Sequence, residues 1–341
     1  MDSQRQRPAL TAAKTVFVGA VVVGGLLTLT HGVAGVTWRD VVQVLRGVPA
    51  WELGALGALW LGGLCIYSTV LAAALPGLGV GRGLVLNLTG SAVANVVPLG
   101  GAVGTALNWR MVTRWGHTNV AFAAFTVLTN LLDVLCKLLL PLVAVGGLVA
   151  FSTHVPSGLW WVAGTCAALL VALAVLQRLA RGLDGAPLRG PGWWRTALPH
   201  VRTAVDRIGH LLATRWQRLL PGSIGYVAAQ VALLSACLWA VGLHVPLTVV
   251  LVAAAIERLG TLVAITPGGI GVAEIGTVAW LLATGVDPVM AVAGVVLYRA
   301  FVVVMEVPVG GIVLAAWLVH ERRTPAAPEV PAAEEPEEVA A

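Results

Sequence analysis

The stretch Val263-Ala-Ile-Thr-Pro267-Gly268-Gly269-Ile-Gly271-Val-Ala-Glu274-Ile-Gly276 places a helix-breaking loop and a carboxylate inside a long apolar region. Proline cannot continue a backbone hydrogen-bond ladder, and glycine adopts backbone angles that other residues avoid. In hydrocarbon, each backbone polar group without a partner costs about 2–7 kcal/mol. Such a loop is tolerated at membrane depth mainly where it lines a cavity, so it is the first predicted site.

The composition of the 341-residue chain argues against a soluble fold. Hydrophobic residues make up 58% of it, charged residues 11%, and the mean hydropathy is +0.89. Soluble domains are about a quarter charged, so we predict an all-α polytopic membrane protein. The net charge of +5 could indicate nucleic-acid binding. The arginines instead cluster at the ends of apolar segments, as the positive-inside rule describes, so no nucleic-acid partner is predicted.

Metal, cofactor and catalytic motifs are not recognisable in the sequence. The four cysteines stand singly in apolar runs, and the seven histidines are scattered along the chain. Paired cysteine spacing, an HExxH motif, a Walker loop and a Ser/His/Asp arrangement are not found. We therefore predict no metal and no cofactor, and we favour transport over catalysis.

The apolar runs and their flanking arginines predict about six full spans and two re-entrant helical hairpins. Residues 1–14 are expected to be cytoplasmic, 15–323 to form one transmembrane domain, and 324–341 to be a disordered cytoplasmic tail. The run at 15–36 is long and lacks a convincing cleavage site, so an uncleaved span is favoured over a signal peptide. The predicted location is the bacterial cytoplasmic membrane. The predicted spans are 15–36, 51–75, 118–151, 159–176, 221–243 and 288–318, and the predicted hairpins are 84–112 and 247–283.

Two further segments are expected at the membrane surface. Residues 38–47 have the spacing of an amphipathic interfacial helix. The basic cytoplasmic loop 178–220 carries eight arginines against two aspartates. Its part 201–220 has helical apolar spacing, so it is either a helix on the anionic inner leaflet or a solvated basic loop. Asp287 is expected to cap the last span, in which Pro308 is expected to introduce a kink.

Shifting the first half of the chain by about 170 residues superimposes its landmarks on the second half. The halves cover about 51–151 and 221–319, and their first spans are predicted to run in opposite directions. We therefore predict an inverted repeat, with the two hairpins meeting near the midplane. The alternative is a chance match between Gly/Pro-rich segments. The matched landmarks are Trp51 with Pro221, Pro98 with Pro267, Thr118 with Asp287, and Pro141 with Pro308.

Charged residues inside spans are costly, at about 2.5–3.5 kcal/mol each, and usually face the interior. Asp133 and Lys137 are four residues apart and are expected to pair on one helical face. Glu257 and Arg258 are adjacent, so one of them is expected to pair elsewhere.

Two more charges have open alternatives. Glu274 follows the glycine loop, where it could cap a half-helix, contact a cationic substrate group or carry a proton. Arg299 suits a phosphate through its forked donors, or it could pair with Glu274 or Glu306.

These residues give the chain a resemblance to the lysylphosphatidylglycerol synthase transmembrane-region family, which is similar to the flippase half of the multiple-peptide-resistance-factor proteins. The resemblance covers about residues 14–323. It implies a compact helical bundle with paired re-entrant hairpins that translocates or holds lipid. It is carried by Pro267-Gly268-Gly269-Ile-Gly271-Val-Ala-Glu274 preceded by Arg258, by Asn95-Val-Val-Pro98 with its glycines, and by Tyr298-Arg299.

The chain departs from this family at two places. Members often carry an acidic residue after the first proline-glycine stretch, where this chain has Ala102 to Thr105. They also often carry a charged pair before the aspartate of the third span, where it has Thr129-Asn130. A charge-based role for the first loop is therefore not expected. The synthase domain is absent from the sequence, so lysyl transfer is not predicted.

The leading hypothesis is a lipid flippase-like transporter whose partners are membrane lipids and, through 178–220, the anionic inner leaflet. The alternatives are a membrane-embedded enzyme acting on a lipid-linked substrate and an accessory subunit of a glycosyltransferase or synthase. The predicted substrate-binding residues are Arg258, Glu274, Arg299, Asn95, Pro98, Gly100, Gly101, Pro267, Gly268, Gly269, Gly271 and Asp133.

Overall fold

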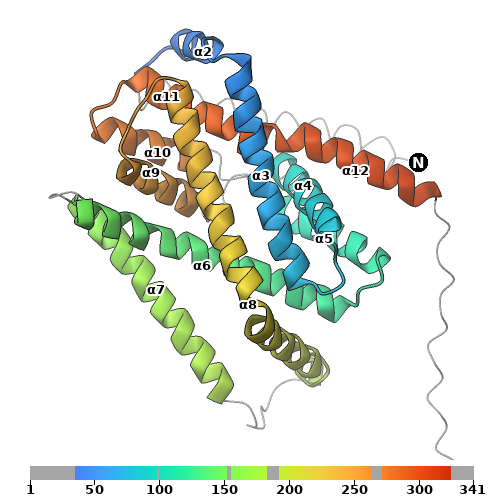
Figure 1. The fold of residues 1–341 in the computed structure, drawn as a ribbon. Coiled ribbons are helices and arrows are strands. Elements are labelled where there is room, and N and C mark those ends of the chain that lie inside the picture. The colour runs from blue at the N-terminus through green and yellow to red at the C-terminus, as the bar shows by residue number, and fades with distance from the viewer. Residues whose placement is uncertain (1–34, 98–99, 152–154, 183–191, 263–270, 324–341) are drawn as a thin grey trace, which may run out of the picture.

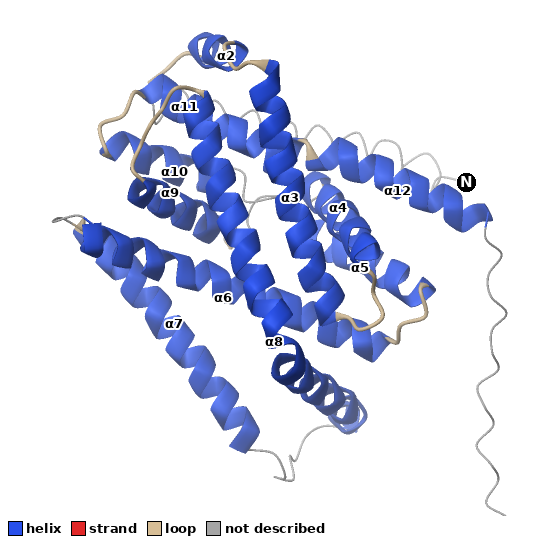
Figure 2. Ribbon diagram, in the orientation of Figure 1, coloured by secondary structure: helices blue, strands red, loops and turns tan. Residues whose placement is uncertain are grey.

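The computed structural model describes residues 35–97, 100–151, 155–182, 192–262 and 271–323. Within these ranges every regular element is a helix (Figures 1 and 2), which confirms the all-α prediction. The helices are α2 (Trp38–Arg46), α3 (Ala50–Ala74), α4 (Val80–Val96), α5 (Gly100–Arg114), α6 (Asn119–Phe151), α7 (Ser157–Gly182), α8 (Gly192–Ala240), α9 (Leu247–Gly260), α10 (Val272–Ala283), α11 (Pro288–Arg299) and α12 (Glu306–Arg323).

Five helical stretches in the described residues are long and apolar enough to cross a membrane. They correspond to the last five of the six predicted spans, so the chain is a multi-pass membrane protein. The predicted first span, 15–36, lies almost wholly outside the described residues. The five stretches are Ala50–Ala74, Asn119–Phe151, Ser157–Val175, Val205–Ala240 and Pro288–Arg323.

Two pairs of short helices occupy the segments predicted as hairpins. α4 packs on α5, and α9 packs on α10. Small residues allow the close crossings, because Gly90 lies against Gly104 and Gly260 lies against Ala273. The proline-glycine turns themselves, at 98–99 and 263–270, lie outside the described residues. Entry of the two hairpins from opposite membrane faces stays a prediction.

The basic segment 192–220 is the first part of α8, so for 201–220 the helical alternative is the one observed. Its position on the inner leaflet stays a prediction. The predicted start of a separate span at Pro221 is wrong, because α8 continues through this residue to Ala240. Figure 1 shows the earlier, darker part of α8 at an angle to the later part. Proline has no N–H to donate and crowds the preceding turn, so a helix that contains it bends rather than ends.

The last long span contains a break in its α-helical hydrogen bonding, and this break lies before Pro308, where the sequence analysis predicted a kink. A π-helical segment, Ala300–Val304, separates α11 from α12, and Met305 N–H donates to the Ala300 carbonyl at 2.8 Å. Pro308 cannot donate to the carbonyl four residues earlier, and it stands in the first turn of α12, where that loss is tolerated. The predicted cap is confirmed, because Asp287 Oδ1 accepts from Met290 N–H at 2.9 Å.

The predicted amphipathic helix near the start is α2, whose Val41 is fully buried. It packs on α11, and Figure 1 shows it across one end of the bundle. The helix is therefore observed, whereas its placement at a membrane interface stays a prediction.

Both halves have the same order of helices: one long, two short and one long. α3 and the later part of α8 run antiparallel, because Gly63 meets Ala229 near one end of the contact and Val70 meets Gly222 near the other. The halves also exchange contacts, since α4 packs on α12 and α9 packs on α6. A two-fold relation between halves would produce this crosswise packing, and it supports the inverted repeat, which stays a prediction.

Candidate functional site

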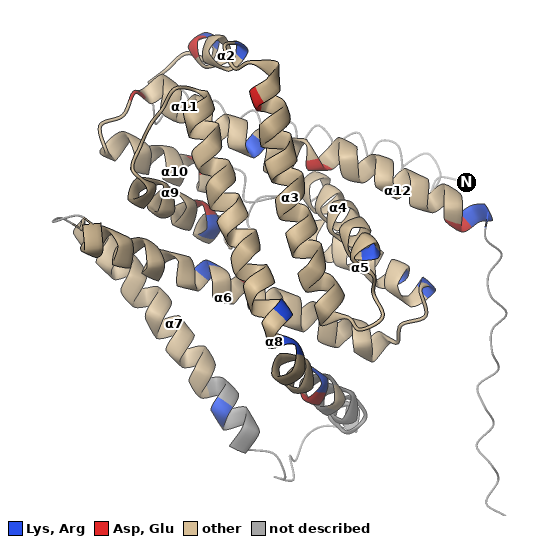
Figure 3. Cartoon of the chain, in the orientation of Figure 1, with Lys and Arg blue, Asp and Glu red and all other residues tan. Residues whose placement is uncertain are grey.

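Four charged side chains from α9, α10 and α11, three of them buried and Arg258 partly buried, form one ion-pair network. Arg299 joins two carboxylates, with its NH1 nitrogen 3.0 Å from Glu257 Oε1 and its Nε 2.7 Å from Glu274 Oε1. Arg258 Nε lies 3.3 Å from the other oxygen of Glu257. Figure 3 shows opposite charges side by side at α9, inside a mostly uncharged bundle. Two arginines balance two glutamates, so the network is neutral and its charges are compensated without water.

The network settles several of the pairing alternatives. Arg299 pairs with Glu274 and also with Glu257, which the sequence did not anticipate. Glu274 is a cap as well, because its Oε2 accepts the Gly271 N–H at 2.7 Å. Gly271 has a φ of +98°, a backbone conformation that favours glycine. The Glu274 side chain thus caps the start of α10 and also neutralises Arg299.

A chain of polar contacts leads from this network to α3. Arg258 donates to Tyr298 Oη at 3.3 Å, and Tyr298 donates to Gln230 Oε1 at 3.3 Å. Gln230 Nε2 donates to Tyr226 Oη at 2.8 Å, and the Tyr226 ring lies 4.7 Å from the Tyr67 ring. These are all three tyrosines of the chain. Sequence reasoning missed their roles, although their position inside apolar runs, away from the interfacial belt, was a usable signal.

A polar cavity of about 490 Å³ lies beside the network, with Arg258 in its wall. Its lining comes from α3, α4, α5, α6, α8, α9 and the residue that follows α9. It is therefore built by both halves of the chain, although most of the lining comes from the first half. The polar lining residues are Tyr67, Asn87, Ser91, Thr105, Asn108, Thr126, Thr129, Asn130, Asp133, Lys137, Tyr226, Arg258 and Thr261.

Three lining side chains have a buried polar atom without a protein partner. These atoms are Asn87 Nδ2, Asn108 Oδ1 and Thr126 Oγ1. Buried polar groups in proteins are nearly always hydrogen-bonded, to water or a ligand where protein is not available. The wall therefore contains both donor and acceptor capacity that the described protein groups leave unused. None of these three residues was predicted, because uncharged polar residues give little signal in an apolar helix.

The pair predicted from i,i+4 spacing is confirmed, since Lys137 Nζ lies 2.7 Å from Asp133 Oδ2. Both side chains line the cavity. Lys137 is the more buried, with 14% of its side chain exposed against 37% for Asp133. The ammonium is thus compensated locally, as the spacing predicts.

The other predicted site residues are distributed as follows. Gly101 lines the cavity together with Asp133 and Arg258. Asn95 Nδ2 donates to the buried Glu306 at 3.1 Å and so links α4 to α12. Gly100 packs against the backbone of Ala94. Glu274, Arg299 and Gly271 belong to the adjoining ion-pair network. Pro98, Pro267, Gly268 and Gly269 lie outside the described residues.

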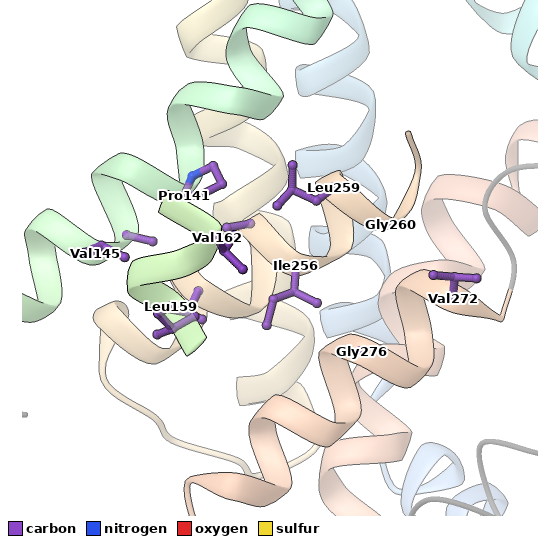
Figure 4. Close-up of a pocket in the computed structure, with 12 residues that line it drawn as sticks. Pro141, Val145, Leu159, Val162, Ile256, Leu259, Gly260, Val272 and Gly276 are labelled. Atoms are coloured by element: carbon purple, nitrogen blue, oxygen red, sulfur yellow. The ribbon is translucent and has the colours of Figure 1, made fainter. Parts of the chain in front are cut away.

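Two apolar cavities share helices α6 and α9 with the polar one. The first, about 360 Å³, lies between α6, α7, α9 and α10 (Figure 4), where Pro141, Val162, Ile256 and Leu259 surround it. The second, about 690 Å³, lies between α6, α8 and α9. One turn of α6 separates Lys137 in the polar wall from Pro141 in the first apolar wall. Polar and apolar cavities thus lie along the same helices.

A family model described as the lysylphosphatidylglycerol synthase TM region matches residues 16–310. This range contains the first half, the second half up to residue 310, the ion-pair network and every described residue of the polar cavity. No curated protein matches the chain at a significant level. The length of the family match decides the assignment, and the predicted resemblance is confirmed. The chain therefore belongs to the lysylphosphatidylglycerol synthase TM region family.

Proposed function

We propose that the protein is a flippase-like transporter that moves or holds a lipid head group between the two leaflets. The observation that carries the proposal is the polar cavity inside a bundle whose spans are otherwise apolar. Polar and ionisable groups inside a membrane are costly, and they usually mark the path of a polar substrate. The family's description links it to a synthase of a lipid, which supports a lipid substrate.

The neighbouring apolar cavities support a lipid over a water-soluble solute. A head group in the polar cavity leaves its acyl chains in an apolar environment, either in these cavities or in the bilayer. The tails then keep their favourable contacts with hydrocarbon while the head group crosses, so the main cost of flipping is reduced.

The test is head-group translocation in proteoliposomes that contain fluorescently labelled phospholipids. An impermeant quencher added outside reports which labels have moved from the inner to the outer leaflet. We expect the wild type to exceed protein-free liposomes, and Arg258→Gln to lower the rate about tenfold or more because it removes the charged donor from the wall. Arg258→Gln leaves Glu257 paired with Arg299, so the fold is retained.

The matched control is Arg82→Gln, at an exposed arginine that lies over the ring of Trp115, away from the cavity wall. It removes the same charge and should leave the rate unchanged. A wild-type rate equal to that of empty liposomes, for every lipid class tested, would overturn the proposed function.

A further inference from the structure

The polar cavity occupies, in the first half, positions that correspond to the ion-pair network of the second half. Two anchors fix the correspondence. The crossing Gly90–Gly104 matches the crossing Gly260–Ala273. The N-cap Thr118, which accepts from Ala121 N–H at 3.2 Å, matches the N-cap Asp287.

These anchors give three of the four network members a counterpart in the cavity wall, whereas the fourth, Arg258, corresponds to Leu88, which does not line the cavity. Asn87 stands three residues before Gly90, as Glu257 stands before Gly260; Thr105 follows Gly104, as Glu274 follows Ala273; and Asn130 stands twelve residues after Thr118, as Arg299 stands after Asp287. The three counterparts are all uncharged, and all three line the cavity.

The two sets of positions differ in what they leave for a ligand. In the second half, carboxylates and guanidinium groups satisfy one another at 2.7–3.3 Å. In the first half, shorter amide and hydroxyl side chains leave open space and buried atoms without protein partners, at Asn87, Asn108 and Thr126. The charged groups of the second set pair with one another, whereas the amide and hydroxyl groups of the first set can form hydrogen bonds with a ligand.

We propose that the first-half cavity, together with Arg258, selects a phosphate-linked lipid head group that carries hydroxyls and no amine, of the glycerol or sugar type, and that the other three network members, Glu257, Glu274 and Arg299, pair with one another and bind no ligand. This inference rests on the proposed function and names its substrate class. Asn87, Thr105 and Asn130 bind the hydroxyls, and Arg258 binds the adjoining phosphate, which its forked donors suit.

The charges around the cavity disfavour a cationic head group. Asp133 is paired with Lys137, Glu257 and Glu274 with arginines, and Glu306 accepts from Asn95. Among the described residues around the cavity, each carboxylate therefore already has a partner. An amine would have to displace one of these partners and would leave that partner, for example Lys137, without its counter-ion.

The experiment transplants the second-half ion pair into the first half. The variant Thr105→Glu/Asn130→Arg fills the cavity with a Glu274–Arg299-like pair. Purified full-length protein in nanodiscs is titrated with phosphatidylglycerol, phosphatidylethanolamine and lysyl-phosphatidylglycerol, and bound lipid is counted by native mass spectrometry. We expect the wild type to prefer phosphatidylglycerol over both amine-bearing lipids about tenfold or more, and the double variant to lose this preference.

Folding is followed separately by thermal unfolding. Each single substitution places an unpaired charge in the cavity wall and should lower Tm, whereas the double variant should recover most of the loss. The milder Asn87→Leu removes one donor without adding a charge and should weaken phosphatidylglycerol binding severalfold. The control, Arg114→Gln, removes an exposed charge that lies outside the cavity wall and leaves Glu321 paired with Arg110, so it should bind as the wild type does.

Retention of wild-type preference by both Thr105→Glu/Asn130→Arg and Asn87→Leu would overturn the proposal, as would equal binding of all three lipids by the wild type. Selective binding without transfer between leaflets would instead contradict the proposed function and leave this inference standing. Transfer that persists in the double variant, with its lipid preference lost, would support both.

Discussion

Arg299 illustrates, at the scale of single residues, why a buried charge inside a span is not by itself a ligand site. Its guanidinium joins carboxylates from α9 and α10, and only 9% of its side chain is exposed. The sequence offered a phosphate or a carboxylate as its partner. Only the folded arrangement shows two carboxylates within reach, so a structural role for this residue now has direct support.

The first residue-scale prediction concerns the stability that this network provides. Arg299→Met leaves Glu257 and Glu274 without their shared cation in a buried setting, so it should lower the free energy of unfolding by about 3–5 kcal/mol. Lys137→Met breaks a pair whose aspartate is 37% exposed and should cost about 0–1 kcal/mol. Thermal unfolding in detergent measures both. Equal shifts in the two variants would contradict the difference expected from burial.

The second residue-scale prediction concerns pH. His117 lies between α5 and α6, and its pKa is lowered below the usual value by partial burial and by Arg82 and Arg207. The folded protein therefore holds this proton less tightly than the unfolded chain. The stability that His117 contributes is complete above pH 6.5 and is lost as pH falls through the interval between the two pKa values. His117→Gln should flatten the fall of Tm below pH 6.5.

Local spacing made some residue contacts predictable and tertiary packing decided the rest. The Asp133–Lys137 pair and the Asp287 cap follow from neighbours within four residues, so the sequence was sufficient. Asn87, Thr126 and Tyr226 reach the cavity from three different helices, and nothing in their local sequence sets them apart. The cavity could not be predicted because it exists only where those helices meet.

At the scale of helices, apolar run length predicted the spans well because the hydrocarbon thickness sets that length. The observed long helices begin and end near the predicted limits, as for α3 and α6. The differences are at proline. α8 continues through Pro221 without ending, and the irregularity before Pro308 begins at Ala300. Proline marks a lost hydrogen bond, while the surrounding helices decide where the backbone adjusts.

The element-scale prediction concerns the crossing of α12 over α4. A Cβ added to Gly310 would overlap the carbonyl of Leu88, whereas one added to Gly311 meets nothing within 4 Å. Gly310→Ala should therefore cost about 1–3 kcal/mol of stability. Gly311→Ala should be neutral or stabilise by up to about 1 kcal/mol through helix propensity. Chemical unfolding measures the free energy of unfolding of both variants, which differ only in which of two adjacent residues of α12 is changed. An equal effect would show that α12 and α4 cross at a greater distance than the structure shows.

At the scale of the whole molecule, crosswise packing means that neither half can form the site alone. α9 of the second half lies against α6 of the first, and α4 of the first lies against α12 of the second. Most of the cavity wall belongs to the first half, while Tyr226 and Arg258 come from the second. If the halves are inverted copies, their short helices should begin at opposite membrane faces.

Single cysteines test that arrangement directly. With the four native cysteines replaced, Val80→Cys marks the start of α4 and Leu247→Cys the start of α9; both positions are exposed, at 47% and 62%. The arginine pattern places the first on the cytoplasmic face and the second on the outer face. A membrane-impermeant maleimide should therefore label Leu247→Cys in intact cells and Val80→Cys only in inside-out vesicles. Both should react after solubilisation in detergent, which controls for thiol reactivity. Labelling of both sites from one face would exclude the inverted repeat, because the two hairpins would then enter the membrane from the same side.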